Sequence, residues 1–295
     1  MKIEREVIRH PDASMRCMQL RQPAFRGDLH RHRHAELTWI EHGRGLRWVG
    51  DSVEPFADGD LVLLGSEVAH LWWTQDIGPA PPCVATVLQF PVDWAAATGL
   101  PELRALEGLM QRASRGLSIE GAARREVQAL LARLEAADPP RRVALLIETL
   151  ALMSELQGRQ SPELRSLSVL APDGGPQDET AALRRQRLDR LLRWVHAHLA
   201  EELRAGDAAQ MVGVSPAAFS RFFRREMGKS FIDFVNDARC SLAALRLLQG
   251  REPIAEIAHA CGFATLSNFG EQFRRRHGVA PRAYRRQARG GTPSA

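Results

Sequence analysis

An internal repeat in the last third of the chain limits the possible folds more than any other feature. The stretch "AQMVGVSPAAFSRFFRREMG", from Ala209 to Gly228, resembles "AHACGFATLSNFGEQFRRRHG", from Ala258 to Gly278. Each copy has an alanine, a glycine four residues later, and then the series Phe-x-x-x-Phe-Arg-Arg-x-x-Gly. Chance similarity between two alanine- and arginine-rich helices rarely preserves so many positions in order. We therefore interpret this region as a duplicated helical unit.

Each copy has the features of a helix–turn–helix. Gly213 and Gly262 stand where the chain turns, and a turn of this kind needs the left-handed backbone conformation that glycine adopts easily. Ser215, followed by Pro216, and Thr265 are typical N-cap residues of a second helix. The pattern predicts two pairs of helices, joined by a rigid helix over about residues 232–248.

The second helix of each copy has one apolar and one polar face. Its phenylalanines are four residues apart and therefore share the side that faces the core. In DNA-binding proteins of this type, side chains at the start of the second helix reach base edges, and arginines farther along contact phosphates. The residues predicted to bind DNA are Pro216, Ala217, Ser220, Arg221, Arg224 and Arg225 in the first copy, and Leu266, Ser267, Gly270, Glu271, Arg274 and Arg275 in the second.

Charge divides the chain into two parts. Residues 1–180 carry 20 Lys and Arg against 25 Asp and Glu, whereas residues 181–295 carry 20 against 10. The basic second part predicts contact with a polyanion such as double-stranded DNA, and the acidic first part does not.

Length and composition are those of a globular protein with two domains. The chain has 295 residues, of which 44% are hydrophobic and 25% charged. No apolar run approaches the roughly 20 residues that span a bilayer, and the first residues do not resemble a signal peptide. The four cysteines are far apart and form no C-x-x-C pair. We expect a cytoplasmic protein with reduced thiols and no contact with a membrane.

The first part predicts strands followed by helices. From about residue 16 to residue 90, short apolar runs are broken by turns, which favours an antiparallel barrel or sandwich. From 101 to 157, apolar residues recur at helical spacing and form stripes that either pack on the barrel or form a dimer interface. We predict a homodimer through these helices. The predicted domains are 1–157 for sensing and dimerisation and 181–295 for DNA binding, with a linker at 158–180 that is rich in Gly, Pro and Ser.

Residues 181–289 resemble the DNA-binding domain of the AraC/XylS family of transcription regulators. The matching text is "SPAAFSRFFRREMGKSF" and "PIAEIAHACGFATLSNFGEQFRRRHGVAPRAYR", which closes with Gly-x-x-Pro-x-x-Tyr-Arg. Family members usually have arginine at the position of Glu271, after a small polar residue where this chain has Gly270. Glu271 holds neither a phosphate nor a guanine. It either accepts a hydrogen bond from a cytosine amino group or weakens the second unit.

The stretch "HRHRHAE" predicts a second site. On a strand, alternation places His30, His32, His34 and Glu36 on one face. A later turn ends in "GSEVAH", which supplies His70. We predict that these five residues share the barrel interior and form an effector pocket, because each buried titratable group needs a hydrogen bond, a ligand or a metal.

This region also resembles the cupin barrel that precedes the DNA-binding domain in many such regulators. His30-x-His32-x-x-x-Glu36 and the later His70 match the cupin metal motifs. The resemblance implies His30, His32, Glu36 and His70 as ligands of a divalent Fe, Mn, Zn or Ni ion. His32-x-His34 offers another register, and the proline expected before His70 is absent. Two interpretations remain beside the metal site: a pocket that binds a small ligand without metal, and histidines solvated on a loop.

These features predict an α+β protein with two domains. The first is an antiparallel, cupin-like β-barrel with amphipathic helices, and the second is an all-α domain with two helix–turn–helix units. We predict a transcription regulator, not an enzyme, that binds operator DNA, responds to a small-molecule effector in the barrel, contacts RNA polymerase and requires no cofactor. The alternative is a metal-dependent cupin oxygenase or isomerase with an accessory basic domain. The repeated unit favours the regulator, but the sequence does not identify its effector.

Overall fold

The computed structural model describes residues 14–27, 29–74, 81–169 and 179–290. Contacts between residues divide the chain into two compact units. The first holds residues 1–44, 48–52 and 56–174, and the second holds residues 45–47, 53–55 and 175–295. Among the described residues, none of the helices combines the length and apolar character needed to cross a membrane.

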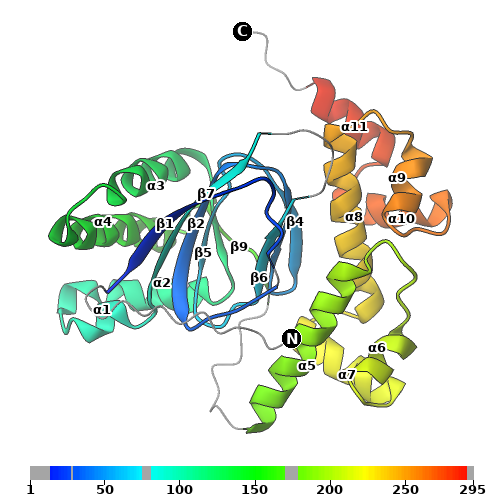
Figure 1. The fold of residues 1–295 in the computed structure, drawn as a ribbon, viewed down its shortest axis with the longest axis horizontal. Coiled ribbons are helices and arrows are strands. Elements are labelled where there is room, and N and C mark those ends of the chain that lie inside the picture. Colours follow the sequence, from blue (N-terminus) through cyan, green and yellow to red (C-terminus); the bar gives the residue numbers. More distant parts are fainter. Residues whose placement is uncertain (1–13, 28, 75–80, 170–178, 291–295) are drawn as a thin grey trace. The chain divides into compact units, whose positions relative to one another are not determined.

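The strands between residues 16 and 166 form two sheets (Figure 1). The larger sheet has the order β1-β7-β2-β5-β8-β9, with bounds Arg16–Gln22, Cys83–Pro91, His34–His42, Leu61–Leu64, Leu117–Ile119 and Leu164–Ser166. The smaller sheet has the order β4-β3-β6, with bounds Ser52–Phe56, Gly45–Val49 and His70–Trp73. Apolar side chains such as Ile40, Phe56 and Val87 pack between the two sheets. Within the described residues, the strands form two sheets, so the predicted cupin-like barrel is not closed by strand pairing.

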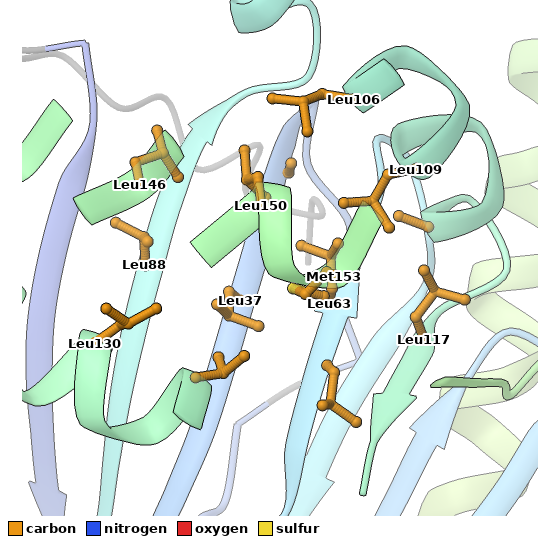
Figure 2. Close-up of a cluster of buried hydrophobic side chains, with 14 of the residues drawn as sticks. Leu37, Leu63, Leu88, Leu106, Leu109, Leu117, Leu130, Leu146, Leu150 and Met153 are labelled. Carbon is orange, nitrogen blue, oxygen red and sulfur yellow. The ribbon is translucent and has the colours of Figure 1, made fainter. Parts of the chain in front are cut away.

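Helices cover the other face of the larger sheet. They are α1 (Trp94–Ala97), a 3-10 turn (Pro101–Leu103), α2 (Ala105–Ala113), α3 (Gly121–Leu134) and α4 (Pro139–Gly158). Figure 2 shows Leu37, Leu63 and Leu88 of the sheet beneath leucines of these helices. Asp138 caps the start of α4. Its side chain accepts a hydrogen bond from the Arg141 amide, and Pro139 occupies the first position of the helix.

The packing of these helices on the sheet changes the argument for a homodimer. We expected the apolar stripes of residues 101–157 to be larger than the surface that the sheet could bury. In the structure, the buried leucines of α2, α3 and α4 pack against the sheet and against each other within one chain. The stripes therefore need no second copy, and the homodimer remains a prediction without this support.

The segment predicted as a linker contains ordered structure at both ends. Strand β9 pairs with β8, so residues 164–166 extend the larger sheet. Helix α5 begins at Glu179, inside the predicted linker. The middle of the predicted linker, 170–178, lies outside the described residues.

The second unit is helical throughout its described length. Its elements are α5 (Glu179–Ala197), α6 (Ala205–Met211), α7 (Pro216–Met227), α8 (Phe231–Gln249), α9 (Ile254–Ala260), α10 (Leu266–His277) and α11 (Pro281–Gly290). The turns before α7 and α10 contain Gly213 and Gly262, with φ of +71° and +85°. At Gly262, an added Cβ would also lie 2.7 Å from the carbonyl oxygen of Leu199. The predicted joining helix is α8.

We predict that Leu63→Ala destabilises the chain by about 2–5 kcal/mol, because it leaves a cavity between the sheet and the helices. Leu63 is 0% exposed, and Leu100 in the same unit is 53% exposed. Urea denaturation should show this loss for Leu63→Ala and less than about 0.5 kcal/mol for the control Leu100→Ala. Equal losses for the two variants would contradict this packing.

Candidate functional site

Helices α7 and α10 repeat the same local design. Each has a hydroxyl at its N-cap: Ser215 accepts a hydrogen bond from the Ala218 amide at 3.3 Å, and Thr265 accepts one from the Asn268 amide at 3.2 Å. Both helices end at a glycine in the left-handed conformation. The two phenylalanines that the repeats share are completely buried in each helix, Phe219 and Phe223 in α7 and Phe269 and Phe273 in α10. The sequence therefore determines where each helix starts, where it ends and which side it buries.

The residues predicted to bind DNA lie on the opposite side of these helices. Eleven of them are exposed, and Gly270 is partly exposed. The exposed residues are Pro216, Ala217, Ser220, Arg221, Arg224, Arg225, Leu266, Ser267, Glu271, Arg274 and Arg275.

The arginines on this side differ in how strongly the chain already neutralises them. Arg275 donates to the Asp233 carboxylate on α8 at 2.6 Å, and Arg225 pairs with its neighbour Glu226 at 2.7 Å. Arg221 and Arg274 make no ion pair within the described residues, and the same holds for Arg224. These three are the arginines whose charge is fully available to a ligand.

Asp233 connects α10 to α8. Its carboxylate accepts a hydrogen bond from the Ser230 hydroxyl at 2.7 Å and one from Arg275. The Ser230 hydrogen bond and Arg275 hold the pKa of this carboxyl below its usual value, against a smaller opposing effect of burial. Arg276, which is nearly buried, donates to Asp237 at 2.5 Å and to the Asp233 carbonyl at 3.1 Å. Arg276 therefore fixes the angle between the two helices and is not a phosphate contact.

The histidines of "HRHRHAE" converge, but not through strand alternation. Strand β2 begins only at His34. His30 instead pairs with His70 in an isolated bridge, with backbone N–O distances of 3.2 and 2.9 Å. The predicted strand was therefore wrong for residues 31–33. The bridge to His70, and not alternation, brings His30 to the cluster.

Glu36 lies at the centre of this cluster. Its carboxylate accepts hydrogen bonds from His32 Nε2 at 3.0 Å, Thr38 Oγ1 at 2.5 Å and Gln89 Nε2 at 2.9 Å. His70 Nε2 lies 3.8 Å from the same carboxylate. Burial raises the pKa of the Glu36 carboxyl, but the hydrogen bonds and neighbouring histidines outweigh burial and leave the pKa below its usual value. Glu36 is therefore ionised.

The two buried histidines carry their hydrogens differently. His32 Nδ1 faces the His34 carbonyl at 2.9 Å and His32 Nε2 faces Glu36, so both nitrogens donate and the ring is an imidazolium. His70 Nδ1 donates to the Val68 carbonyl at 2.8 Å, which leaves a lone pair on Nε2. Burial lowers the pKa of His70 to about 3, so the ring is neutral. Within the described residues, His70 Nε2 is buried without a hydrogen-bond partner.

These side chains fit a divalent cation, whose binding would displace the proton from His32 Nε2. The ligand nitrogens of His30, His32 and His70 lie within 4.8 Å of one another, and the Glu36 carboxylate is adjacent. The carbonyl of Val68 orients His70 as outer-shell carbonyls orient metal-binding histidines. A nitrogen-rich set with one carboxylate suits Fe, Mn, Zn or Ni.

A cavity of about 250 Å³ adjoins the cluster. His30, Glu36 and His70 line it, together with Thr38 and Gln89. The rest of the wall is largely apolar and includes Met18, Leu20, Phe25, Ile40, Leu71, Trp72, Ala85 and Val87. The cavity therefore suits a small molecule with an apolar body and one polar group.

Comparison with known proteins supports a helix-turn-helix domain in the second unit. Residues 208–287 match a family model described as a helix-turn-helix domain. The regulatory protein PocR of Salmonella typhimurium is 38% identical over 101 residues, which cover 34% of this chain and 33% of PocR. The transcriptional activator RhaS of Citrobacter koseri is 26% identical over 275 residues, which cover 90% of each chain. These matches support the resemblance of this chain to AraC/XylS-family regulators.

The chain spans only 33–40% of the length of the first relatives that it matches. The alignment with RhaS of Citrobacter koseri is long enough to include both units. The solved structure of unsaturated fatty acid-bound ToxT from Vibrio cholerae covers 95% of this chain and 97% of ToxT at 16% identity. Its TM-score of 0.35 is too low for a comparison of the two folds.

The structure brings together most of the residues predicted for the pocket. His30, Glu36 and His70 line the cavity, and His32 is hydrogen-bonded to Glu36 without lining the cavity itself. His34 is not among the lining residues and contributes its backbone carbonyl. Sequence reasoning missed Thr38 and Gln89. Gln89 had a recognisable signal, since it is a polar residue within the apolar run "CVATVLQF".

We predict that Glu36→Gln lowers the free energy of unfolding at pH 7 by about 3 kcal/mol, because it leaves the His32 imidazolium buried without a carboxylate. The pKa of Glu36 in the folded chain is below its ordinary value of 4.5, so this stabilisation is complete above pH 4.5 and is lost as the pH falls further. Urea denaturation at several pH values measures it. The exposed pair Glu155–Arg159 provides a control, Glu155→Gln, with an expected loss under about 1 kcal/mol.

Proposed function

We propose that this protein is a transcription regulator that binds double-stranded DNA through α7 and α10 and responds to a small molecule bound in the first unit. The observation that supports DNA binding most directly is the repeated helix pair. Each pair buries its phenylalanines and exposes a capped helix whose outer side carries unpaired arginines. This arrangement supports two helix–turn–helix units.

The joining helix supports simultaneous binding by both units. Helix α8 has 19 residues, and at about 1.5 Å per residue it is about 28 Å long. Successive major grooves on one side of a duplex are about 34 Å apart. A rigid helix of this length suits two reading helices in adjacent grooves. RhaS relatives are named transcriptional activators, which favours activation as the outcome of binding.

The effector pocket is the cavity beside Glu36, in a first unit of cupin type. The apolar wall accommodates the body of the effector, and the lone pair of His70 Nε2 meets its polar group. No cofactor is required for this step. Where a divalent ion is part of the site, His30, His32, Glu36 and His70 hold it, and the ion supplies a Lewis acid for the polar group of the effector. A homodimer and a contact with RNA polymerase complete the proposal.

We predict that Arg221→Ala reduces binding to the preferred operator by about 1–3 kcal/mol and removes the preference at one base pair. Arg224→Ala, the matched change one turn later, should weaken binding to all sequences alike and flatten the salt dependence. Fluorescence anisotropy with operator and random duplexes at several salt concentrations separates the two effects. If Arg221→Ala weakened binding to random DNA as much as to the operator, Arg221 would not read a base.

We predict that effector binding depends on His70 and Glu36, while binding to DNA without effector does not. A thermal-shift screen of the full chain against small metabolites, with and without divalent metals, should find compounds that raise Tm. These shifts should disappear in His70→Leu and persist in His42→Leu, a control histidine that is 67% exposed. Metal analysis of the parent and His32→Ala then identifies a bound ion as about one equivalent that the variant loses. Shifts that survive in His70→Leu would place the effector elsewhere.

A further inference from the structure

The two reading helices carry opposite charges at the same position. Aligning the repeats by their phenylalanines places Phe219 with Phe269, and therefore Arg221 with Glu271. Each of these residues follows the first phenylalanine by two positions, about 200° around the helix from it. That places both at the middle of the exposed side. The neighbouring arginines, one turn later, are the same in the two copies.

Nothing in the described part of the chain neutralises Glu271. It is exposed and takes part in no ion pair, although arginines follow it three and four residues later. Arg275, its i+4 neighbour, is bound to Asp233 at 2.6 Å. An added Cβ at Gly270 would meet nothing within 4 Å, so the surface beside Glu271 is open.

A carboxylate on a DNA-facing helix is repelled by phosphates and by most base edges. In the major groove, guanine presents only acceptors and thymine an acceptor with a methyl group. Adenine offers an amino donor beside the N7 acceptor, which repels the second carboxylate oxygen. Cytosine offers its amino group without an adjacent acceptor on the same base, so it is the base that best suits a carboxylate. Arg221 has the opposite requirement and matches the O6 and N7 acceptors of guanine.

We propose that the two units read a base pair in opposite orientations: Arg221 selects guanine in the first half of the site, and Glu271 selects cytosine at the corresponding place in the second half. This inference rests on the proposed DNA-binding function. It makes the target asymmetric, because the two halves differ at the position that the repeats share. The asymmetry fixes the direction in which the chain lies on the duplex.

The test is selection of bound sequences from a random duplex library with the full chain. The parent should enrich sites with guanine in one half and cytosine at the matching position of the other, with a preference of about tenfold or more at each. Glu271→Gln should change the second preference from cytosine to adenine, because an amide pairs with adenine N6 and N7. Glu271→Arg should change it to guanine. Neither change should alter the first half.

Glu256→Gln is the matched control, since Glu256 is exposed on α9 and its loss changes the net charge equally. It should leave both preferences as they are. If Glu271→Gln instead strengthened binding to every sequence equally and changed no base preference, Glu271 would only weaken the second unit and the inference would be wrong. If the parent enriched no sequence at all, the DNA-binding function itself would fail.

Discussion

The buried carboxylate of Glu36 is the constraint around which the first unit is arranged. It lies on β2, inside the larger sheet, and a charge there is tolerated only because His32, Thr38 and Gln89 donate to it. These donors come from the segment before β2, from β2 itself and from β7. Alternation along β2 then turns Leu37 toward the helices. One strand therefore supplies both the wall of the cavity and the core that holds the helices.

The second unit was predictable because its signals are local. Gly213 and Gly262 have the left-handed backbone that their positions in the repeat suggested, and Ser215 and Thr265 cap the helices that follow them. Each of these features depends on a few neighbouring residues, so the sequence contains all the information needed. The spacing of the phenylalanines likewise determines which side of each helix is buried.

The first unit depends on contacts between distant segments, and here sequence reasoning was less complete. The bridge between His30 and His70 joins residues 40 apart, and no local pattern in "HRHRHAE" indicates it. Alternation gave the correct side for Glu36 but the wrong reason for His30 and His32, because the strand starts at His34. The sequence also did not indicate where the helices pack, since an apolar stripe shows that one side of a helix is buried but does not identify the surface that buries it.

The arginines of the second unit show why a count of charges describes a binding surface poorly. Arg276 is nearly buried and donates a hydrogen bond to Asp237. Arg275 donates to Asp233, whose carboxylate also accepts a hydrogen bond from Ser230, the N-cap residue of α8. These residues hold α10 against α8, so part of the basic character of this unit serves its own packing. Arg221 and Arg274 are unpaired at the surface, where charge attracts phosphate or a base edge. An arginine that is paired with an aspartate therefore stabilises the packing of the helices, whereas an unpaired arginine at the surface is available to bind DNA. Composition alone does not distinguish the two.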